Sequence, residues 1–304
     1  MPVLVTGGTG YIGSHIAEYF ASTGRQVVLI TRDRARAQRL EKPERFECAV
    51  GSLQDAGFVE NVFLQYRPSV VIHTAWEGLA HEQIDSSEQA NNLVWVENLL
   101  KSSAGTGVET FIGLGSQAEY GVYNRRTSES TWPRPTARYG VYKLAAGLLG
   151  RQFASECGMR FAWLRVYSIF GPRDHDYCMV PSVIRSLLKN ESPRLTGCEQ
   201  TWEYLYVKDL ARLLGKVVDS ENKFVGIYNL CSGETVKLKT VVDMIAEIIQ
   251  SSAQPDFGAL PYREYGLSHL EGDNTLFRET FGWCELTGLR EALEETVAWH
   301  RERL

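Results

Sequence analysis

The sequence lacks the features that mark several large classes of protein. Its 304 residues hold no apolar run that approaches the ~18 residues needed to span a bilayer, and we expect no signal peptide, because no basic leader with a cleavage site begins the chain. The six cysteines form no CxxC pair, and no Cys/His spacing is typical of a metal site. We therefore expect free thiols, no metal, no membrane association and a cytoplasmic location.

An excess of positive charge is also absent. The chain has 32 Lys and Arg residues against 37 Asp and Glu residues, and its formal net charge is -5. A nucleic-acid backbone is neutralised by clustered Lys and Arg, and the one basic stretch here, residues 32–39, is short. We therefore expect no nucleic-acid partner. With 44% hydrophobic and 23% charged residues, the composition is that of a globular protein and excludes disorder.

The first half of the chain alternates strand-like and helix-like segments. Continuous apolar runs predict strands that are buried on both faces, at residues 3–6, 26–31, 46–50, 70–73 and 110–114. Helical patterns between these strands include residues 11–22, 34–40 and 86–103. This alternation predicts a parallel sheet with right-handed crossovers.

The second half of the chain is less regular. We expect helices at residues 139–157, 181–190, 207–220, 236–250 and 288–300, and strands at residues 160–166 and 227–230. The predicted fold class is α/β: a Rossmann-type doubly wound parallel sheet with a smaller, mixed α/β cap at the carboxyl end that binds substrate. Residues 1–171 would form the nucleotide-binding body, with parts of 205–232 returning to it, and residues 172–304 would mainly form the cap.

A glycine-rich turn, TGGTGYIG at residues 6–13, joins the first strand to the first helix. Gly7 permits a tight turn, Gly10 lets the backbone approach a diphosphate, and Gly13 lets the helix and the strand pack closely. The diphosphate would then lie at the N-terminus of the helix, where N–H groups and the helix dipole favour anions. A plain glycine-rich turn is the alternative. The strand before the turn and the helix after it favour a dinucleotide site.

The end of the second strand distinguishes between two dinucleotides. An acidic residue there binds the ribose 2′-hydroxyl of NAD, whereas an arginine accommodates the 2′-phosphate of NADP. Thr31 holds the expected acidic position, Arg32 follows it, and Asp33 comes two places later. This pattern favours NADP(H) over NAD(H), because a guanidinium pairs well with a phosphate. We expect Arg36 and Arg39 to lie on a solvated helix face instead.

Three residues form a candidate catalytic set. Tyr139 and Lys143 are spaced i and i+4, which places them on one face of a helix. A lysine beside a tyrosine favours the phenolate and lowers the pKa of the phenol, which suits proton exchange with a carbonyl or an alcohol. Ser116 follows the fifth strand, at the edge where parallel sheets bind ligands, and its hydroxyl could bond the same substrate oxygen. Tyrosine–lysine pairs at this spacing are common in proteins. The prediction of a catalytic set therefore depends on their occurrence after the glycine turn and the serine, in this order.

Together these motifs resemble the extended short-chain dehydrogenase/reductases, in particular the nucleotide-sugar epimerase, dehydratase and reductase family. The resemblance covers nearly the whole chain. It rests on residues 6–13 (TGGxGxIG), 72–75 (VIHxAA), Asn92 within its helix, 115–121 (SSxxVYG), Tyr139 with Lys143, 164–172 (LRxxNxYGP), 204–209 (YxxVxD) and 281–283 (LGW).

The resemblance implies a role for each motif. Tyr139 would be the acid and base, Lys143 would hold the nicotinamide ribose and tune Tyr139, and Ser116 would align the reacting oxygen. The residues implied to bind NADP(H) are Gly7, Gly10, Tyr11, Ile12, Gly13, Thr31, Arg32, Ser52, Leu53, Thr74, Ala75, Trp76, Asn92, Tyr139, Lys143 and Val166. The residues implied to bind a nucleoside-diphosphate sugar are Trp76, Ser116, Gln117, Ser168, Arg173, Val180 and Arg263. A homodimer is also implied, because relatives pair two long helices per subunit, here 86–103 and 139–157.

Several departures from the family pattern narrow the chemistry. Dehydratases of the family carry Asp-Glu directly after the catalytic Ser/Thr, where this chain has Gln117 and Ala118. An uncharged pair cannot transfer the extra protons of water elimination, and the cysteine that certain epimerase-reductases place at position 118 is missing too. The remaining reactions need only hydride transfer and Tyr139. They are reduction of a ketone, or epimerisation through a transient ketone.

The cofactor preference separates these two reactions. Arg32 points to NADPH, and a net reductase consumes that cofactor, whereas a 4-epimerase returns its hydride. The sequence therefore predicts an NADPH-dependent reductase of the 4-keto group of a nucleoside-diphosphate 4-keto-6-deoxyhexose. The alternatives are an NAD(P)-dependent nucleotide-sugar 4-epimerase and a dinucleotide-sensing protein without turnover, in which the Tyr or the Lys would usually be lost.

Further departures affect the ligand contacts. Ser52 stands where the family often has an adenine-contacting Asp, and Trp202 stands at a common diphosphate-binding Arg. Arg263 and Arg173 could take over the diphosphate contact, although a surface ion pair is an equally simple role for each. Trp76 could form a wall of the sugar pocket or be an ordinary core residue.

Overall fold

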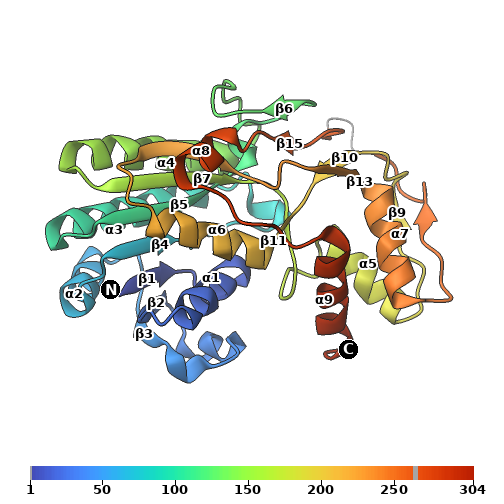
Figure 1. Cartoon of the computed structure of the whole chain (residues 1–304), viewed down its shortest axis with the longest axis horizontal. Helices are drawn as coiled ribbons and strands as arrows, with labels where there is room; N and C mark the ends of the chain where they lie inside the picture. Colours follow the sequence, from blue (N-terminus) through green and yellow to red (C-terminus); the bar gives the residue numbers. More distant parts are fainter. Residues whose placement is uncertain (1, 263–265) are drawn as a thin grey trace.

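Seven parallel strands form one sheet at the centre of the structure, a computed structural model that describes residues 2–262 and 266–304 (Figure 1). Their order across the sheet is β12 (Val225–Leu230), β7 (Arg160–Val166), β5 (Thr110–Ser116), β4 (Val70–His73), β1 (Val3–Thr6), β2 (Val27–Thr31) and β3 (Glu47–Val50). The chain runs outward from β1 in one direction and from β4 in the other, so the predicted doubly wound α/β sheet is confirmed. The strand order reverses between β1 and β4, which is where such sheets bind ligands.

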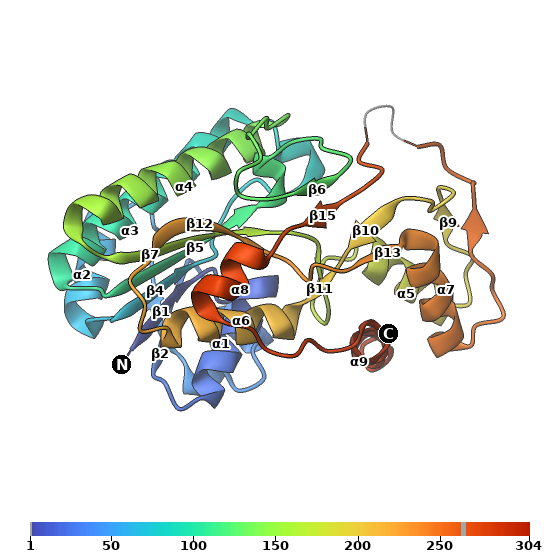
Figure 2. The same ribbon diagram turned by 45° about the horizontal axis from the view of Figure 1, so that its top comes forward.

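Helices cover both faces of this sheet, which explains why its inner strands are apolar on both sides. Every residue of β1, β2 and β4 is buried. Helices α2 (Ala56–Tyr66), α3 (Asn91–Thr106) and α4 (Arg138–Cys157) lie on one face, and α1 (Tyr11–Ser22), α6 (Val207–Asp219) and α8 (Thr275–Phe281) lie on the other (Figure 2). The result is a three-layer body with a separate apolar core on each side of the sheet.

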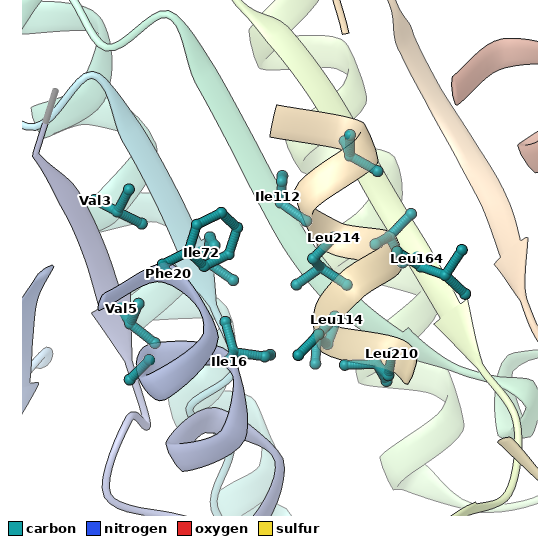
Figure 3. Close-up of a cluster of buried hydrophobic side chains, with 14 of the residues drawn as sticks. Val3, Val5, Ile16, Phe20, Ile72, Ile112, Leu114, Leu164, Leu210 and Leu214 are labelled. Carbon is teal, nitrogen blue, oxygen red and sulfur yellow. The ribbon is translucent and has the colours of Figure 1, made fainter. Parts of the chain in front are cut away.

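The core beneath α1 and α6 shows how the helical spacing produces this packing. Ile16 and Phe20 are four residues apart on α1, and Leu210 and Leu214 are four apart on α6. Figure 3 shows all four side chains directed at the strands, where they meet β-strand residues such as Ile112. The two helices also contact each other along the sheet. Because α1 begins at the glycine turn, this core fixes the direction in which the N-terminus of α1 points.

On the opposite face, α4 lies very close to β7. A Cβ added to Gly147 would lie 2.6 Å from Cδ1 of Trp163, and one added to Gly150 would overlap the ring of Phe161. Both rings are fully buried, so they have no free space into which to move. Since α4 carries Tyr139 and Lys143, this close approach sets the distance of those side chains from the sheet.

The carboxyl-terminal part adds a second group of helices beside the sheet. Helices α5 (Met179–Leu188), α7 (Leu238–Ile249) and α9 (Leu289–Arg301) pack on one another around a third apolar core, to the right in Figure 1. Small two-stranded sheets surround them, β8 (Ile169–Phe170) with β11 (Leu205–Tyr206), β9 (Arg194–Leu195) with β14 (Asp256–Phe257), and β10 (Thr201–Glu203) with β13 (Thr235–Lys237). A further pair is β6 (Arg126–Thr127) with β15 (Glu271–Gly272).

Short 3-10 turns, labelled η, complete the chain. They are η1 (Arg34–Arg39), η2 (Pro43–Arg45), η3 (His81–Gln83), η4 (Ser87–Ala90) and η5 (Gln117–Glu119). No helix within the described residues is long and apolar enough to cross a membrane.

Most predicted elements are present, with shifts that have local causes. The segment predicted as a short helix at 34–40 is the 3-10 turn η1, which the side chain of Asp33 caps by accepting from the N–H of Ala35. The helix predicted from residue 86 begins at Asn91, because η4 precedes it. The helix predicted from residue 236 begins at Leu238, because Thr235–Lys237 pair as β13 with β10. The bounds of α2 and α8 were not predicted.

The close approach of α4 to β7 can be tested with a single methyl group. Gly147→Ala is expected to lower the free energy of unfolding by about 1–3 kcal/mol, because the added carbon overpacks the rigid Trp163 ring. Gly105→Ala is the matched control, because Gly105 is an exposed residue of α3 with open space around its Cα. It should gain up to about 1 kcal/mol from helix propensity. Urea unfolding measures both, and a Gly147→Ala protein as stable as the control would contradict this account of the packing.

Candidate active site

A cavity of about 580 Å³ opens at the carboxyl ends of the sheet strands, at the point where the strand order reverses. The glycine turn after β1 and the segment after β4 lie side by side there, since the N–H of Thr74 donates to the carbonyl of Thr6 at 3.2 Å. The ends of β2, β5 and β7 and the start of α4 also line the cavity. Parallel strands therefore bring chemically distinct side chains from distant parts of the chain to one place.

The glycine turn has the shape that a dinucleotide requires. Gly7 has a φ of 70°, in the left-handed region, and a Cβ there would lie 2.6 Å from the hydroxyl of Thr74. A Cβ on Gly13 would overlap the carbonyl of Gly7, so only glycine fits at either position. No side chain caps α1, and no acidic residue occupies its first turn. The N-terminus of α1 is thus open to an anion, and these residues fit a bound diphosphate.

Three charged groups meet at the rim of the cavity beside the end of β2. Arg32 and Arg36 both line it, and the guanidinium of Arg32 pairs with the carboxylate of Glu77. Thr31 is buried and binds the backbone of Asp33 through its hydroxyl, at 3.0 Å. Arg36 was expected on a solvated helix face. Its side chain is exposed, as expected, but it also lines the cavity. The side chain of Arg39 lies outside the described parts of the structure.

Trp76 forms one wall of the cavity and is held from behind. Its indole N–H donates to Oε1 of Gln89 at 2.9 Å. The carboxamide of Asn92 accepts from the N–H of Glu77 at 2.9 Å and donates to the carbonyls of Glu77 and Gln89. Asn92 is fully buried and is not among the residues that line the cavity. Its amide instead fixes the segment that carries Trp76.

Ser116 and Tyr139 meet where β5 ends and α4 begins. The N–H of Tyr139 donates to the carbonyl of Ile84 at 2.8 Å, which anchors the first turn of α4. Burial raises the pKa of Tyr139 to about 12, although a hydrogen bond with the hydroxyl of Ser116 acts in the opposite direction. Tyr139 therefore keeps its proton throughout the neutral range. In this arrangement it is a proton donor held against the serine hydroxyl.

Lys143 lies one turn further along α4 and is also buried. Its ammonium donates to the carbonyl of Leu114 at 2.6 Å and lies 3.8 Å from the centre of the Trp76 ring. Burial lowers the pKa of Lys143 to about 7, and the carboxylate of Glu119 limits that fall. The expected lowering of the Tyr139 pKa by Lys143 is therefore not seen. Burial penalises both charged forms more strongly than the two groups stabilise each other.

Most of the predicted residues meet in this one cavity. Those that line it are Gly7, Gly10, Tyr11, Ile12, Gly13, Thr31, Arg32, Leu53, Thr74, Ala75, Trp76, Ser116, Tyr139, Lys143 and Val166. Ser52 is not among the lining residues, although its neighbours Gly51 and Leu53 are, and its hydroxyl accepts from the N–H of Gln54. Arg263 lies outside the described residues.

Four residues predicted to bind the substrate lie elsewhere. Arg173 has a left-handed backbone, and its guanidinium binds Ser14 at 2.9 Å and Glu18 at 2.7 Å on α1. It lines a neighbouring cavity of about 500 Å³ that meets the first one at the glycine turn. Val180 packs in the third core, on the buried stripe of α5. Gln117 begins η5 without reaching the cavity. The hydroxyl of Ser168 accepts from Trp202 at 2.6 Å, so these two departures from the family pattern contact each other.

Other residues at the cavity were assigned no role from the sequence, although His175 was expected near the mouth of the pocket. His175 and Tyr177 line it with stacked rings, 5.1 Å apart and 7° from parallel. They follow the GP of residues 171–172, in a segment that carries no motif. Behind the cavity, Glu119 is a fully buried carboxylate next to Ser116. The sequence could have pointed to Glu119, because a charged residue stands there at the position where the family pattern SSxxVYG has valine.

Comparison with known proteins agrees with this geometry. The model of the NAD dependent epimerase/dehydratase family matches residues 3–231. A dTDP-6-deoxy-L-talose 4-dehydrogenase (NAD(+)) of Aggregatibacter actinomycetemcomitans is 26% identical over 278 residues, which cover 87% of this chain and 97% of that protein. A dTDP-D-glucose 4,6-dehydratase of Dictyostelium discoideum is 24% identical over 254 residues, or 75% of this chain. The chain spans only 57% of the length of that relative.

Two UDP-glucose 4-epimerases are among the solved structures that resemble the whole chain. A UDP-glucose 4-epimerase of Thermotoga maritima, solved with UDP-glucose, has a TM-score of 0.89 at 25% identity and covers 100% of this chain and 99% of its own. A UDP-glucose 4-epimerase of Thermus thermophilus, solved with NAD, has a TM-score of 0.87 at 26% identity and covers 100% of both chains.

The burial of Lys143 predicts a specific pH dependence of stability. Its pKa falls from 10.5 in the unfolded chain to about 7 in the folded protein, so protonation favours unfolding as the pH drops from 10.5 to 7. Lys143→Met removes this effect. The variant should be more stable than the wild type at pH 7, and the difference in melting temperature should shrink as the pH rises toward 10. Thermal unfolding across this range measures it, and a difference that does not change with pH would rule out the buried ammonium as its cause.

Proposed function

The chain belongs to the NAD dependent epimerase/dehydratase family, and from this premise we propose that it reduces a nucleotide-linked keto sugar with NADPH. The family consists of enzymes of the extended short-chain dehydrogenase/reductase type. The proposed substrate is a nucleoside-diphosphate 4-keto-6-deoxyhexose, and the reduced group is its 4-keto group. The product would be the corresponding 4-hydroxy sugar.

The observation that carries this proposal is the meeting of Ser116, Tyr139 and Lys143 in the cavity that the glycine turn also lines. A ketone that accepts a hydride at carbon must receive a proton at oxygen, and the partly buried phenol of Tyr139, whose pKa burial raises to about 12, is an acid that holds that proton in place. The hydroxyl of Ser116, bound to Tyr139, would align the same carbonyl oxygen. Lys143 would bind the ribose next to the nicotinamide, as the resemblance implies.

The residues after Ser116 support reduction over elimination of water. Gln117 and Ala118 carry no charge, and neither lines the cavity. Glu119 is a carboxylate, but it is fully buried and its oxygens bind Ser116, Trp163 and Arg165. Among the described residues, the three that follow Ser116 therefore supply no free acid or base for proton removal from carbon.

The cavity lining also supports a dinucleotide with a 2′-phosphate. Residues of the glycine turn would hold the diphosphate, and Arg32 and Arg36 would contact the phosphate on the ribose. Bound NADPH would supply the hydride. The related 4-dehydrogenase carries NAD(+) in its name, and the solved 4-epimerase of T. thermophilus contains NAD. The preference of this chain for NADPH thus depends on the two arginines.

The surroundings of Ser116 support a sugar with a methyl group at C6. Val166 lies opposite Ser116 in the sheet, and the lining continues through Leu114, Tyr167 and Ile169. Among the described residues that line the cavity, the charged side chains other than Lys143 are Arg32, Arg36 and Glu77, which meet at the end of β2. A carboxylate at C6 would find no cation there, whereas a methyl group would contact apolar atoms.

A nucleotide-sugar 4-epimerase is the second candidate, and the two solved 4-epimerases favour it. It would use the same serine, tyrosine and lysine, because its second half-reaction is the reduction of a ketone. It differs in returning the hydride to the same sugar, so the cofactor shows no net change. Net consumption of NADPH therefore separates the two functions.

We also propose which ligand each part of the chain binds and that the protein forms a homodimer. Residues 1–171, with parts of 205–232, would bind the dinucleotide, and residues 172–304 would mainly hold the nucleotide sugar. Two copies would pair through α3 and α4 in the cytoplasm. Their outer faces support this pairing, because they expose the apolar side chains of Val94, Val141, Leu148 and Leu149.

NADPH absorbance tests the reaction directly. We expect stoichiometric oxidation of NADPH with one of the dTDP-, CDP- or GDP-linked 4-keto-6-deoxyhexoses, and no oxidation by Tyr139→Phe. Tyr142→Phe is the matched control, because Tyr142 lies on the same helix and does not line the cavity. It should keep wild-type activity. Interconversion of two 4-hydroxy nucleotide sugars without any change in NADPH would contradict the reductase and favour the 4-epimerase.

The two arginines predict which variants change the choice of cofactor. Arg32→Ala should lower kcat/KM for NADPH by about 10- to 100-fold, the value of one or two charge-assisted hydrogen bonds, and should leave kcat/KM for NADH nearly unchanged. Arg34→Ala is the control, because Arg34 is an exposed residue of η1 outside the cavity. Equal losses with NADPH and NADH after Arg32→Ala would show that Arg32 does not contact the 2′-phosphate.

A further inference from the structure

Glu119 is the buried carboxylate closest in sequence to the candidate catalytic serine. It is the last residue of η5, three positions after Ser116, and no part of it is exposed. A charge without solvent is costly unless it is paired and fully hydrogen-bonded. The surroundings of Glu119 meet this condition and lead directly to the catalytic residues.

Three donors from two parts of the chain, the end of β5 and strand β7, bind the two carboxylate oxygens. Oε1 accepts from the N–H of Ser116 at 2.9 Å and from the indole of Trp163 at 2.8 Å. Oε2 accepts from Nε of Arg165 at 2.8 Å, and the Arg165 side chain is only 3% exposed. The guanidinium also lies 4.4 Å from the centre of the Tyr120 ring. Glu119 thus joins the turn that carries Ser116 to strand β7.

The bond to Ser116 is one half of a reciprocal pair. The hydroxyl of Ser116 accepts from the N–H of Ala118 at 3.1 Å, while the carboxylate of Glu119 accepts from the N–H of Ser116. This capping box fixes the backbone of Ser116 and the direction of its hydroxyl. An apolar residue at position 119 would leave the N–H of Ser116 and the indole of Trp163 without this acceptor.

The carboxylate is also a fixed negative charge behind the cavity. The titratable and charged groups that face it or its neighbours are Arg165 on β7, Tyr120 after η5, Tyr139 and Lys143 on α4, His73 on β4 and Glu129. Among these groups, the negative charge of Glu119 raises the pKa of both Tyr139 and Lys143. It therefore favours the protonated forms of the two catalytic candidates.

We propose that Glu119, held by Arg165, is a positioning residue that fixes Ser116 and thereby its contact with Tyr139. This inference rests on the proposed function, because reduction requires Tyr139 as an acid. The oxidative half-reaction of an epimerase requires the phenolate instead. A buried anion behind Tyr139 thus biases the site toward reduction.

The test uses the full-length protein and Glu119→Gln, which keeps the shape and one acceptor oxygen but removes the charge. We expect kcat for reduction of the keto sugar to fall by about 10- to 100-fold at pH 7. The amide must direct its NH2 either at Arg165 or at the N–H groups of Ser116 and Trp163, and the serine then loses its alignment. The affinity for NADPH, measured by fluorescence without sugar, should stay within about twofold of wild type, since Glu119 does not line the cavity. The alkaline limb of the pH profile of reduction should move to lower pH.

Two further variants distinguish this role from a structural one. Glu119→Gln with Arg165→Met removes both buried charges, so it avoids an unpaired guanidinium if the single variant folds poorly. Asp209→Asn is the matched control, because Asp209 is also a buried carboxylate paired with an arginine, Arg212 on α6. The control should change stability without moving the pH profile. A profile that keeps its midpoint in both Glu119 variants would overturn the proposal.

A second readout needs no sugar substrate. Reductive methylation of Lys143 by formaldehyde, followed by peptide mass spectrometry across pH, reports the titration of that amine. Its midpoint should fall by about one pH unit in Glu119→Gln, because a nearby negative charge is lost. A shifted midpoint in a protein that reduces no keto sugar would support the effect of Glu119 and contradict the reductase. An unshifted midpoint in an enzyme that reduces the keto sugar would support the reductase and contradict the effect of Glu119.

Discussion

The burial of the Lys143 ammonium is the constraint around which the site is arranged. An amine without solvent needs acceptors and a nearby negative charge, and the structure supplies the carbonyl of Leu114, the face of Trp76 and the carboxylate of Glu119. Each of these comes from a different element. The close contact of α4 with β7 brings them within reach, and so the packing of the core determines the charge state of the catalytic groups.

The same burial determines what Tyr139 can do. A phenol that is buried and bonded to Ser116 remains an acid at neutral pH, which suits the donation of a proton to a ketone. Reductases and 4-epimerases share this step, so the fold and the three catalytic candidates do not separate them. The separation depends on the groups around them: the arginines at the end of β2, the uncharged residues after Ser116, and the buried charge of Glu119.

Sequence reasoning located those parts of the site that depend on local backbone geometry. The glycine turn, the strand ends and the spacing of Tyr139 and Lys143 each follow from short-range rules, and the structure brings them to one cavity. The directions of side chains could not be predicted in the same way. Arg173 follows a motif that suggested a ligand contact, but its left-handed backbone and the carboxylate of Glu18 direct it to α1. The carboxamide of Asn92 binds the backbone of Glu77, and this could not be read from its place in a helix.

The central claim is that burial keeps Tyr139 protonated, and its titration can be observed directly. NMR of the protein labelled with ¹³C at Cζ of tyrosine resolves phenol from phenolate, and the Tyr139 signal among the 14 tyrosines is the one that Tyr139→Phe removes. The account predicts a phenol signal that persists beyond pH 10, consistent with a pKa of about 12. A phenolate signal that emerges near neutral pH would contradict it, because Tyr139 would then be poised as a base.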